Sequence, residues 1–188
     1  MFRLLLFLSL FPLAIALAAR WWFGARVLAG MAGRPCRCDL ARWLPAPGDD
    51  ALVHRAEASA GEFGRQLRLK ALAGWHEQDP KAAAARENTR RFSSAVPPLS
   101  GIVAIFAVLG AKIPVAGAIA ILLGATALAA VMGLLSLPSE LAAIARYARN
   151  VRAAKTFPSS DEEDAVIRCA AAHAWDASLP PILRWTQR

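Results

Sequence analysis

Residues 113–137, which read IPVAGAIAILLGATALAAVMGLLSL, decide the fold of this chain. These twenty-five residues contain no charged side chain. An α-helix rises about 1.5 Å per residue, so the segment would extend over roughly 37 Å, which exceeds the roughly 30 Å hydrocarbon core of a bilayer. The segment is therefore predicted to cross a membrane as a helix.

A second uncharged run, residues 96–111, precedes this segment. It covers sixteen residues and opens with Pro97 and Pro98, so by itself it could be a re-entrant segment. The sequence GAKIP at 110–114, however, suits a short turn between two antiparallel helices. We therefore predict a transmembrane helical hairpin over residues 96–137.

A third uncharged run, residues 4–19, is followed by Trp21, Trp22 and Phe23. Aromatic side chains collect at membrane interfaces, so residues 1–23 are predicted to form an N-terminal transmembrane anchor. The alternative is a cleaved secretory signal peptide, because Arg3 precedes the run and the sequence ALA at 16–18 matches a small-x-small cleavage site.

The composition combines 56% hydrophobic residues with a net charge of +8. The apolar content excludes a disordered chain, and 3 cysteines in 188 residues exclude a disulfide scaffold. Thirteen basic and eight acidic residues lie between positions 20 and 95, beside the predicted spans. No nucleic-acid-binding motif accompanies them. The charge therefore indicates the flank of a membrane and not a nucleic-acid partner.

Basic residues lie on both flanks of the predicted hairpin, whereas its turn contains only Lys112. By the positive-inside rule both flanks face the cytoplasm, which predicts a multi-pass protein of the bacterial inner membrane with a cytoplasmic C-terminus. We expect the basic flanks to contact the anionic headgroups of the lipid bilayer. The residues expected to do so are Arg86, Arg90, Arg91, Arg146, Arg149, Arg152 and Lys155.

The regions outside the spans are predicted to be helical, which makes the chain an all-α integral membrane protein. Residues 24–95 form a cytoplasmic segment, with one helix or two from about Ala51 and another from Pro80, and no pattern of strands. Residues 138–188 begin with a basic amphipathic helix, which either lies on the inner leaflet or packs on residues 24–95. Its apolar face would consist of Leu141, Ile144, Ala148 and Val151.

A last helix is predicted after Pro158, where Ser160 and Glu163 have the spacing of a capping box, and it would end near Ala174. Within the hairpin, small residues recur four positions apart, which lets a facing helix approach closely in lipid. We expect them to pack against residues 96–111, and contact between copies of the chain is the alternative. These residues are Ala120, Gly124, Ala125, Ala129 and Gly133.

No catalytic, cofactor-binding or metal-binding residue is predicted. His76 and Glu77 begin an HExxH zinc motif, but Pro80 occupies the position of the second histidine. Cys36 and Cys38 lack a second pair at zinc-binding spacing, so they are interpreted as reduced thiols. The alternatives are a small channel or transport-associated subunit and a metallopeptidase with an unrecognised site built from His54, Glu57, His76 and Glu77.

Residues 90–185 resemble the YugP-type neutral zinc metallopeptidases of bacterial membranes in the order of their elements. The similarity rests on the hydrophobic hairpin, the sequence LPSE at 137–140, the Ala- and Arg-rich helix up to Arg152, the acidic start at 162–163 and the sequence ILR at 182–184. The zinc-binding HExxH of that family has no counterpart here. The resemblance therefore implies a shortened, non-catalytic relative, which acts as a scaffold or partner of another membrane protein, such as an active membrane protease.

Overall fold

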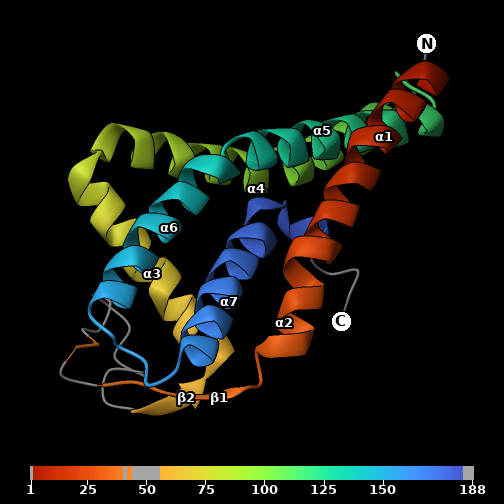
Figure 1. Ribbon diagram of the computed structural model, residues 1–188. Helices are drawn as coiled ribbons and strands as arrows, with labels where there is room; N and C mark the ends of the chain where they lie inside the picture. The colour runs from red at the N-terminus through yellow and green to blue at the C-terminus, as the bar shows by residue number, and fades with distance from the viewer. Residues whose placement is uncertain (1, 40–41, 44–55, 184–188) are drawn as a thin grey trace. The chain divides into compact units, whose positions relative to one another are not determined.

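The computed structural model describes residues 2–39, 42–43 and 56–183 (Figure 1). It is about 82% helical, which confirms the prediction of a nearly all-α chain. The chain divides into two compact units, and each unit is assembled from segments that lie far apart in the sequence. The predicted segments 24–95 and 138–188 therefore belong largely to one unit, and the predicted anchor and hairpin belong to the other.

Unit 1 comprises Met1–Arg20, Arg86–Ser136 and Ala177–Arg188. In it, helix α1 (Phe2–Arg20) packs against helix α5 (Val115–Leu135). The core at this contact consists of small and branched side chains, namely Leu13, Ala16, Ala127, Ala130 and Leu179. The N-terminal helix, the second helix of the hairpin and the segment after helix α7 thus share one core. The short 3₁₀ helix Pro181–Leu183 belongs to this last segment.

Helix α4 (Pro80–Leu109) begins at the predicted proline and continues through Pro97 and Pro98. A short turn over residues 110–114 then leads into α5, with Ala111 at a positive φ of 52°. The contacts between the two helices run in opposite directions along the chain: Arg86 with Ser136, Ser93 with Ala129, and Gly101 with Leu122. The two helices are therefore an antiparallel hairpin, as predicted.

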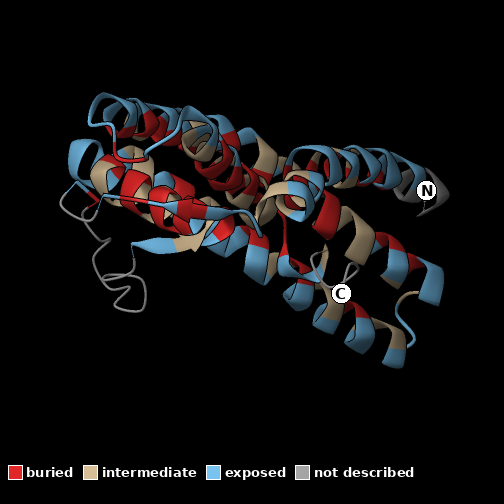
Figure 2. Cartoon of the chain, turned by 60° about the horizontal axis from the view of Figure 1, so that its bottom comes forward, coloured by how far each residue is buried: buried red, intermediate tan, exposed pale blue. Residues whose placement is uncertain are grey.

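Three helical stretches are long and apolar enough to cross a membrane, namely Phe7–Met31, Pro80–Leu109 and Val115–Ala153. Many of their residues are exposed and appear pale blue in Figure 2. In unit 1 the exposed side chains include large apolar ones: Phe7, Leu8, Phe11, Phe106, Leu109, Val115 and Leu135. These features are compatible with a membrane protein, because extended apolar surface marks contact with lipid or with another protein.

Unit 2 comprises Trp21–Ala85 and Leu137–Asp176. After α1 the chain forms a π-helical turn (Trp21–Ala25) and the short helix α2 (Arg26–Met31). The larger helices are α3 (Ala60–Gln78), α6 (Leu137–Ala153) and α7 (Ser160–Ser178), whose last two residues belong to unit 1. Helix α6 starts at Leu137, directly after α5.

Unit 2 also contains a small antiparallel sheet, which the sequence analysis did not predict. Strand β1 (Pro35–Arg37) pairs with strand β2 (Glu57–Ser59), and Cys36 lies opposite Ala58. Helix α3 starts only after this strand, where Ser59 and Glu62 form a capping box. The prediction of a helix over residues 57–59 is therefore wrong, and residues 51–55 lie outside the described residues. Three-residue strands are too short to show a periodic pattern.

The core of unit 2 forms between α3 and α6. Helix α6 packs against α3 and buries Ile144, Ala148 and Val151 of its predicted apolar face, whereas Leu141 is only partly buried. Of the two predicted surroundings for this face, the structure shows packing on residues 24–95. A cluster of three rings, Trp43, Phe63 and Phe157, lies in the same unit with centroid distances of 5.4 to 5.6 Å in edge-to-face geometry.

Three predicted helix boundaries need correction. Pro158 was predicted to end the basic amphipathic helix, but helix α6 ends at Ala153, because Lys155 turns the chain with a φ of 48°. The cap of α7 is Ser159, whose hydroxyl oxygen accepts a hydrogen bond from the Glu162 N–H at 3.2 Å, whereas Ser160 is the first helical residue. Helix α7 then continues to Ser178, because the polar residues after Ala174 interrupt the apolar pattern without breaking the helix.

Candidate functional site

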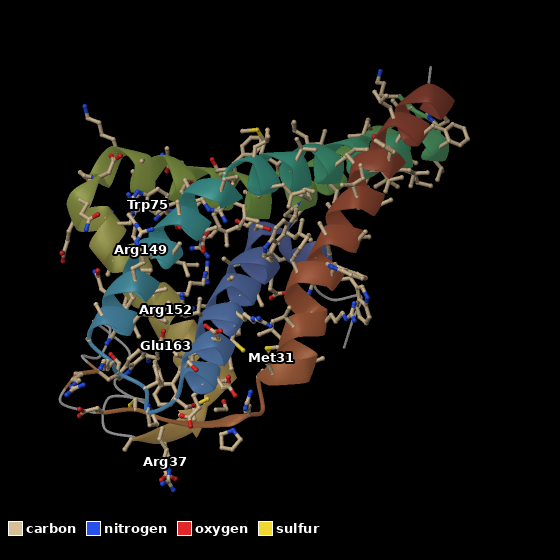
Figure 3. The ribbon with its side chains drawn as sticks, viewed as in Figure 1. Met31, Arg37, Trp75, Arg149, Arg152 and Glu163 are labelled. Atoms are coloured by element: carbon tan, nitrogen blue, oxygen red, sulfur yellow. The ribbon has the colours of Figure 1, made fainter. Side chains whose placement is uncertain are left out.

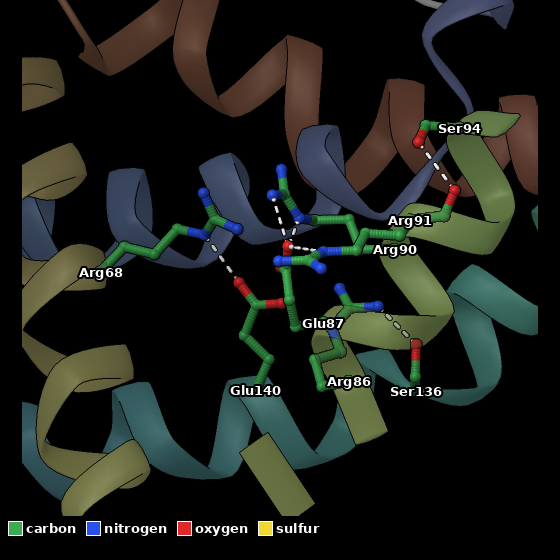
Figure 4. Close-up of polar contacts among 8 residues, drawn as sticks. All are labelled: Arg68, Arg86, Glu87, Arg90, Arg91, Ser94, Ser136 and Glu140. Atoms are coloured by element: carbon green, nitrogen blue, oxygen red, sulfur yellow. Dashed lines mark hydrogen bonds and ion pairs between the residues drawn. The ribbon is translucent and has the colours of Figure 1, made fainter. Parts of the chain in front are cut away.

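The arginines that were predicted to contact headgroups occupy different environments. Arg86 is buried, and its guanidinium donates hydrogen bonds to the Gly133 carbonyl at 3.3 Å and to the Ser136 hydroxyl (Figure 4). Its predicted role at the membrane surface is therefore wrong. The guanidinium instead binds polar groups near the C-terminal end of α5, where free carbonyl groups favour a cation.

Arg90 and Arg91 share one carboxylate within helix α4. Arg90 donates to both oxygens of Glu87 at 2.8 and 3.0 Å, and Arg91 donates to one of them at 3.0 Å (Figure 4). The two arginine side chains are 56% and 75% exposed. Exposed ion pairs of this kind contribute little to stability. Another anion could therefore replace the Glu87 carboxylate as the partner of the two arginines at a small cost in free energy.

Arg152 is tied to the start of helix α7. Its guanidinium forms ion pairs with Glu163 at 2.7 Å and with Asp164, and Figure 3 labels Arg152 and Glu163 on the facing helices. The acidic first turn of α7 thereby neutralises part of the basic face of α6. Lys155 is exposed at the turn between the two helices. The remaining basic residues of α6 are Arg146 and Arg149.

Arg146 and Arg149 line a pocket between α3 and α6 with a volume of about 270 Å³. Trp75 on α3 and Arg149 on α6 are labelled in Figure 3. Ala71, Trp75 and Ala143 are buried and line the pocket, whereas both arginines are exposed. Within residues 56–183 neither guanidinium has a hydrogen bond or an ion pair. This is the strongest candidate binding site in the described chain.

The small residues of α5 contact three different neighbours. A Cβ atom at Gly124 would lie 3.6 Å from the Ser9 hydroxyl oxygen of α1, and one at Gly133 would collide with the Ser178 carbonyl oxygen. The Ala129 carbonyl accepts a hydrogen bond from Ser93 of α4 at 3.0 Å. Ala120 is also buried, and Ala125 is partly buried. The partners in these contacts lie outside residues 96–111, the neighbour that was predicted for these small residues.

The three cysteines are free and buried. Burial raises the pKa of the Cys36 and Cys38 thiols, and it raises that of Cys169 to about 11, with a smaller contribution from the nearby Cys36. Thiolates, not thiols, act as nucleophiles and metal ligands. The raised pKa values therefore favour the interpretation of these residues as inert thiols.

The residues of the alternative metallopeptidase site do not converge among the described residues. Glu57 forms an ion pair with Arg37 across the sheet at 2.8 Å, and His76 and Glu77 are exposed near the end of α3. His54 lies outside the described residues. In the part of the chain that the structure describes, no group of three or more His, Cys, Asp or Glu side chains could hold a metal ion.

Two charged residues buried in unit 2 were missed by the sequence analysis. Lys70 is 6% exposed, and its Nζ lies 4.3 Å from the centroid of the Trp43 ring, where burial lowers its pKa to about 8. Glu140 is 1% exposed and accepts a hydrogen bond from Arg68 at 2.6 Å (Figure 4). The signal for Lys70 was its helical spacing from the buried Phe63 and Leu67, which places it on the same face.

Comparisons of the chain with protein families, with curated proteins and with solved structures gave no match. The resemblance to membrane zinc metallopeptidases therefore stays a prediction from the sequence, and the candidate sites are judged by their geometry and chemistry.

Proposed function

We propose that this chain is a non-catalytic protein of the bacterial inner membrane, which acts as a scaffold or partner of another membrane protein. The observation that carries the proposal is the exposed apolar surface of unit 1, where side chains such as Phe106 (70% exposed) and Leu135 (72% exposed) face outward. In lipid this surface is favourable, and part of it can bind a helix of a second protein.

Helix α1 is proposed to be a retained anchor and not a cleaved signal peptide. Leu13 and Ala16 belong to the core that α1 forms with α5, and Ala16 is fully buried. Cleavage after Ala18 would remove both side chains and expose Ala127 and Ala130. With α1 and the hairpin as three spans, the basic flanks and the C-terminus lie in the cytoplasm by the positive-inside rule.

Reporter fusions test the proposed topology. Green fluorescent protein fused to the C-terminus should fluoresce, whereas alkaline phosphatase at the same position should be inactive. Alkaline phosphatase inserted after Lys112 should be active. An active phosphatase at the C-terminus would contradict the three-span topology.

Crosslinking in intact membranes tests the partner. A photoreactive amino acid at Phe106, which is exposed, should give a discrete protein adduct, while the same probe at Ala104, which is 3% exposed on the same helix, should give none. Equal adducts at both positions, or only lipid adducts at Phe106 and at the equally exposed Leu109, would count against a protein partner on this helix.

A further inference from the structure

The pocket between α3 and α6 in unit 2 has a positive charge that no carboxylate of the described residues neutralises. Arg146 and Arg149 line it together with Gln78, Tyr147 and Asn150, and none of the described residues that line it is acidic. None of these five side chains has a hydrogen-bond partner within the described residues. Two cations and several further hydrogen-bonding groups are thus available to a ligand at one place.

This arrangement differs from that of several other arginines in unit 2. Arg37, Arg42 and Arg152 each form an ion pair with a carboxylate. A second pocket, of about 230 Å³, is also lined by two arginines, Arg34 and Arg168, but it contains two aspartates as well. The charge of the α3–α6 pocket is therefore a local property and does not follow from the basic composition alone.

We infer that the α3–α6 pocket binds the phosphate group of a small ligand, with Arg146 and Arg149 as its principal contacts. The two arginines are three residues apart, so they lie on one face of α6. A guanidinium matches phosphate oxygens with paired, charge-assisted hydrogen bonds, and two guanidinium groups balance the charge of a phosphate monoester. Amide groups of Gln78 and Asn150 add neutral donors at the rim.

The size of the pocket restricts the ligand. Its volume of about 270 Å³ lies below the roughly 300 to 1,000 Å³ that is usual for ligand pockets. It therefore accommodates a phosphorylated headgroup or a small phosphate ester and not a large cofactor. The buried Trp75, Ala71 and Ala143 supply an apolar lining for the part of the ligand next to the phosphate.

Two sources can supply this phosphate: a soluble phosphate ester or the headgroup of a membrane lipid. Helix α6 begins at Leu137, immediately after the apolar helix α5 and its C-cap residue Ser136. Chain connectivity keeps Arg146 within roughly 14 Å of the start of α6. A lipid headgroup is therefore within reach if α5 spans a membrane. Only this lipid source rests on the proposed function, because binding of soluble phosphate does not require membrane insertion.

The test is calorimetric titration of the full chain, in a non-ionic detergent at low salt, with inorganic phosphate. The Arg146→Gln/Arg149→Gln variant should bind at least tenfold more weakly than the wild type. The matched control is Arg34→Gln/Arg168→Gln, which removes the same charge from the second pocket and should stay within about twofold of the wild type. An equal loss in both variants would overturn the proposal, and so would a wild type that binds no phosphate.

A conservative variant separates a binding defect from a folding defect. Arg146→Lys/Arg149→Lys keeps the charge but loses the planar donor pairs, so its affinity should lie between those of the wild type and the glutamine variant. Wild-type affinity in the glutamine variant would also overturn the proposal. Thermal unfolding of all three double variants should coincide with that of the wild type, because all four substituted arginines are exposed.

Mixed micelles then distinguish the two sources. Phosphatidic acid should compete with inorganic phosphate and bind more tightly if the ligand is a lipid headgroup, whereas phosphatidylcholine should not compete. A phosphate affinity that phosphatidic acid leaves unchanged would assign the pocket to a soluble phosphate ester. If the topology fusions fail and phosphate binding persists, the proposed function is wrong and the pocket assignment stands.

Discussion

The two units of this chain distribute polar and apolar groups in opposite ways. In unit 1 large apolar side chains face outward, and polar groups turn inward to backbone carbonyls: Ser93 donates to Ala129 at 3.0 Å and Thr126 to Leu122 at 2.7 Å. In unit 2 the rings of Trp43 and Phe63 are buried, and exposed arginines such as Arg37 and Arg152 pair with carboxylates. The hydroxyl groups of Ser93 and Thr126 in unit 1 thus have hydrogen-bond partners within the protein, as polar groups in a lipid environment require.

This contrast also appears in the charges. Unit 2 contains 14 basic and 13 acidic residues, whereas unit 1 contains 8 basic residues and 1 acidic residue, so most charged side chains lie in unit 2 but most of the net charge of +8 lies in unit 1. Four substitutions test the comparison, because each alters the kind of interaction on which one unit depends.

The largest effect is expected at the buried ion pair of unit 2. Glu140→Ala leaves the Arg68 guanidinium without its carboxylate at a site where Glu140 is 1% exposed, so the free energy of unfolding should fall by about 3 to 5 kcal/mol. Denaturant titration of the full chain in mild detergent measures this loss. The double variant Arg68→Met/Glu140→Leu should recover most of it. A loss below about 1 kcal/mol in Glu140→Ala would contradict a structural role for the pair.

Close helix packing in unit 1 gives the second prediction. Gly133→Val places side-chain atoms against the Ser178 carbonyl oxygen, so it should destabilise the chain by about 1 to 3 kcal/mol, measured by thermal unfolding in detergent. The control is Gly74→Ala in unit 2, where an added Cβ meets no atom within 4 Å. Alanine there should stabilise by about 0.5 to 1 kcal/mol, because glycine is the weaker helix former. A neutral Gly133→Val would mean that the two segments are not in close contact.

The third prediction concerns the buried lysine of unit 2. Burial lowers the pKa of Lys70 from 10.5 to about 8, so the folded state is penalised while the amine is charged. Lys70→Met should therefore stabilise the chain at pH 7 by on the order of 1 to 3 kcal/mol.

The pH dependence gives a sharper test of the same group. Between pH 8 and 10.5 the unfolded chain binds the Lys70 proton and the folded chain does not, so wild-type stability rises with pH relative to Lys70→Met. The advantage of the variant should be full below pH 8 and disappear near pH 10.5. Lys81→Met, an exposed control, should show no such pH dependence. A difference in stability between the wild type and Lys70→Met that stays constant with pH would show that Lys70 is not buried as a cation.

The smallest effect is expected at the start of helix α7. Ser159→Ala removes the hydroxyl oxygen that accepts the Glu162 N–H, which should cost about 1 kcal/mol. Ser160→Ala, one residue later, should change stability by only a few tenths of a kcal/mol, since alanine is a good helix former inside the first turn. Paired thermal unfolding curves measure both, and equal losses would contradict the assignment of Ser159 as the cap.

Much of the fold could be predicted because its signals are local. The uncharged runs, Pro80 at a helix start and the apolar face of α6 are each visible within one short segment. The strand pair Pro35–Arg37 and Glu57–Ser59 was missed because its hydrogen bonds join segments about twenty residues apart. The cap at Ser159 was misplaced by one residue, since two adjacent serines have equal capping propensity.

The candidate site was predicted only in part. Arg146 and Arg149 were predicted to contact anionic headgroups, but the α3 side of their pocket, with Trp75 and Gln78, was not foreseen. The opposite error occurred at Arg86, whose charge suggested a surface position although the side chain is buried. In both cases the environment of an arginine depends on a helix that lies far from it in the sequence.

The sequence by itself determined that the chain is helical and that three of its stretches are apolar enough to cross a membrane, since periodicity and the absence of charge are properties of single segments. Only the tertiary structure decided which segments share a unit, because α1 packs on α5 and α3 packs on α6 through long-range contacts. In the tertiary structure Arg86, Lys70 and Glu140 are buried, and Arg146 and Arg149 lie beside a pocket. The affinity of a charged side chain for a ligand depends on its neighbours in space, and these cannot be read from the order of residues in the sequence.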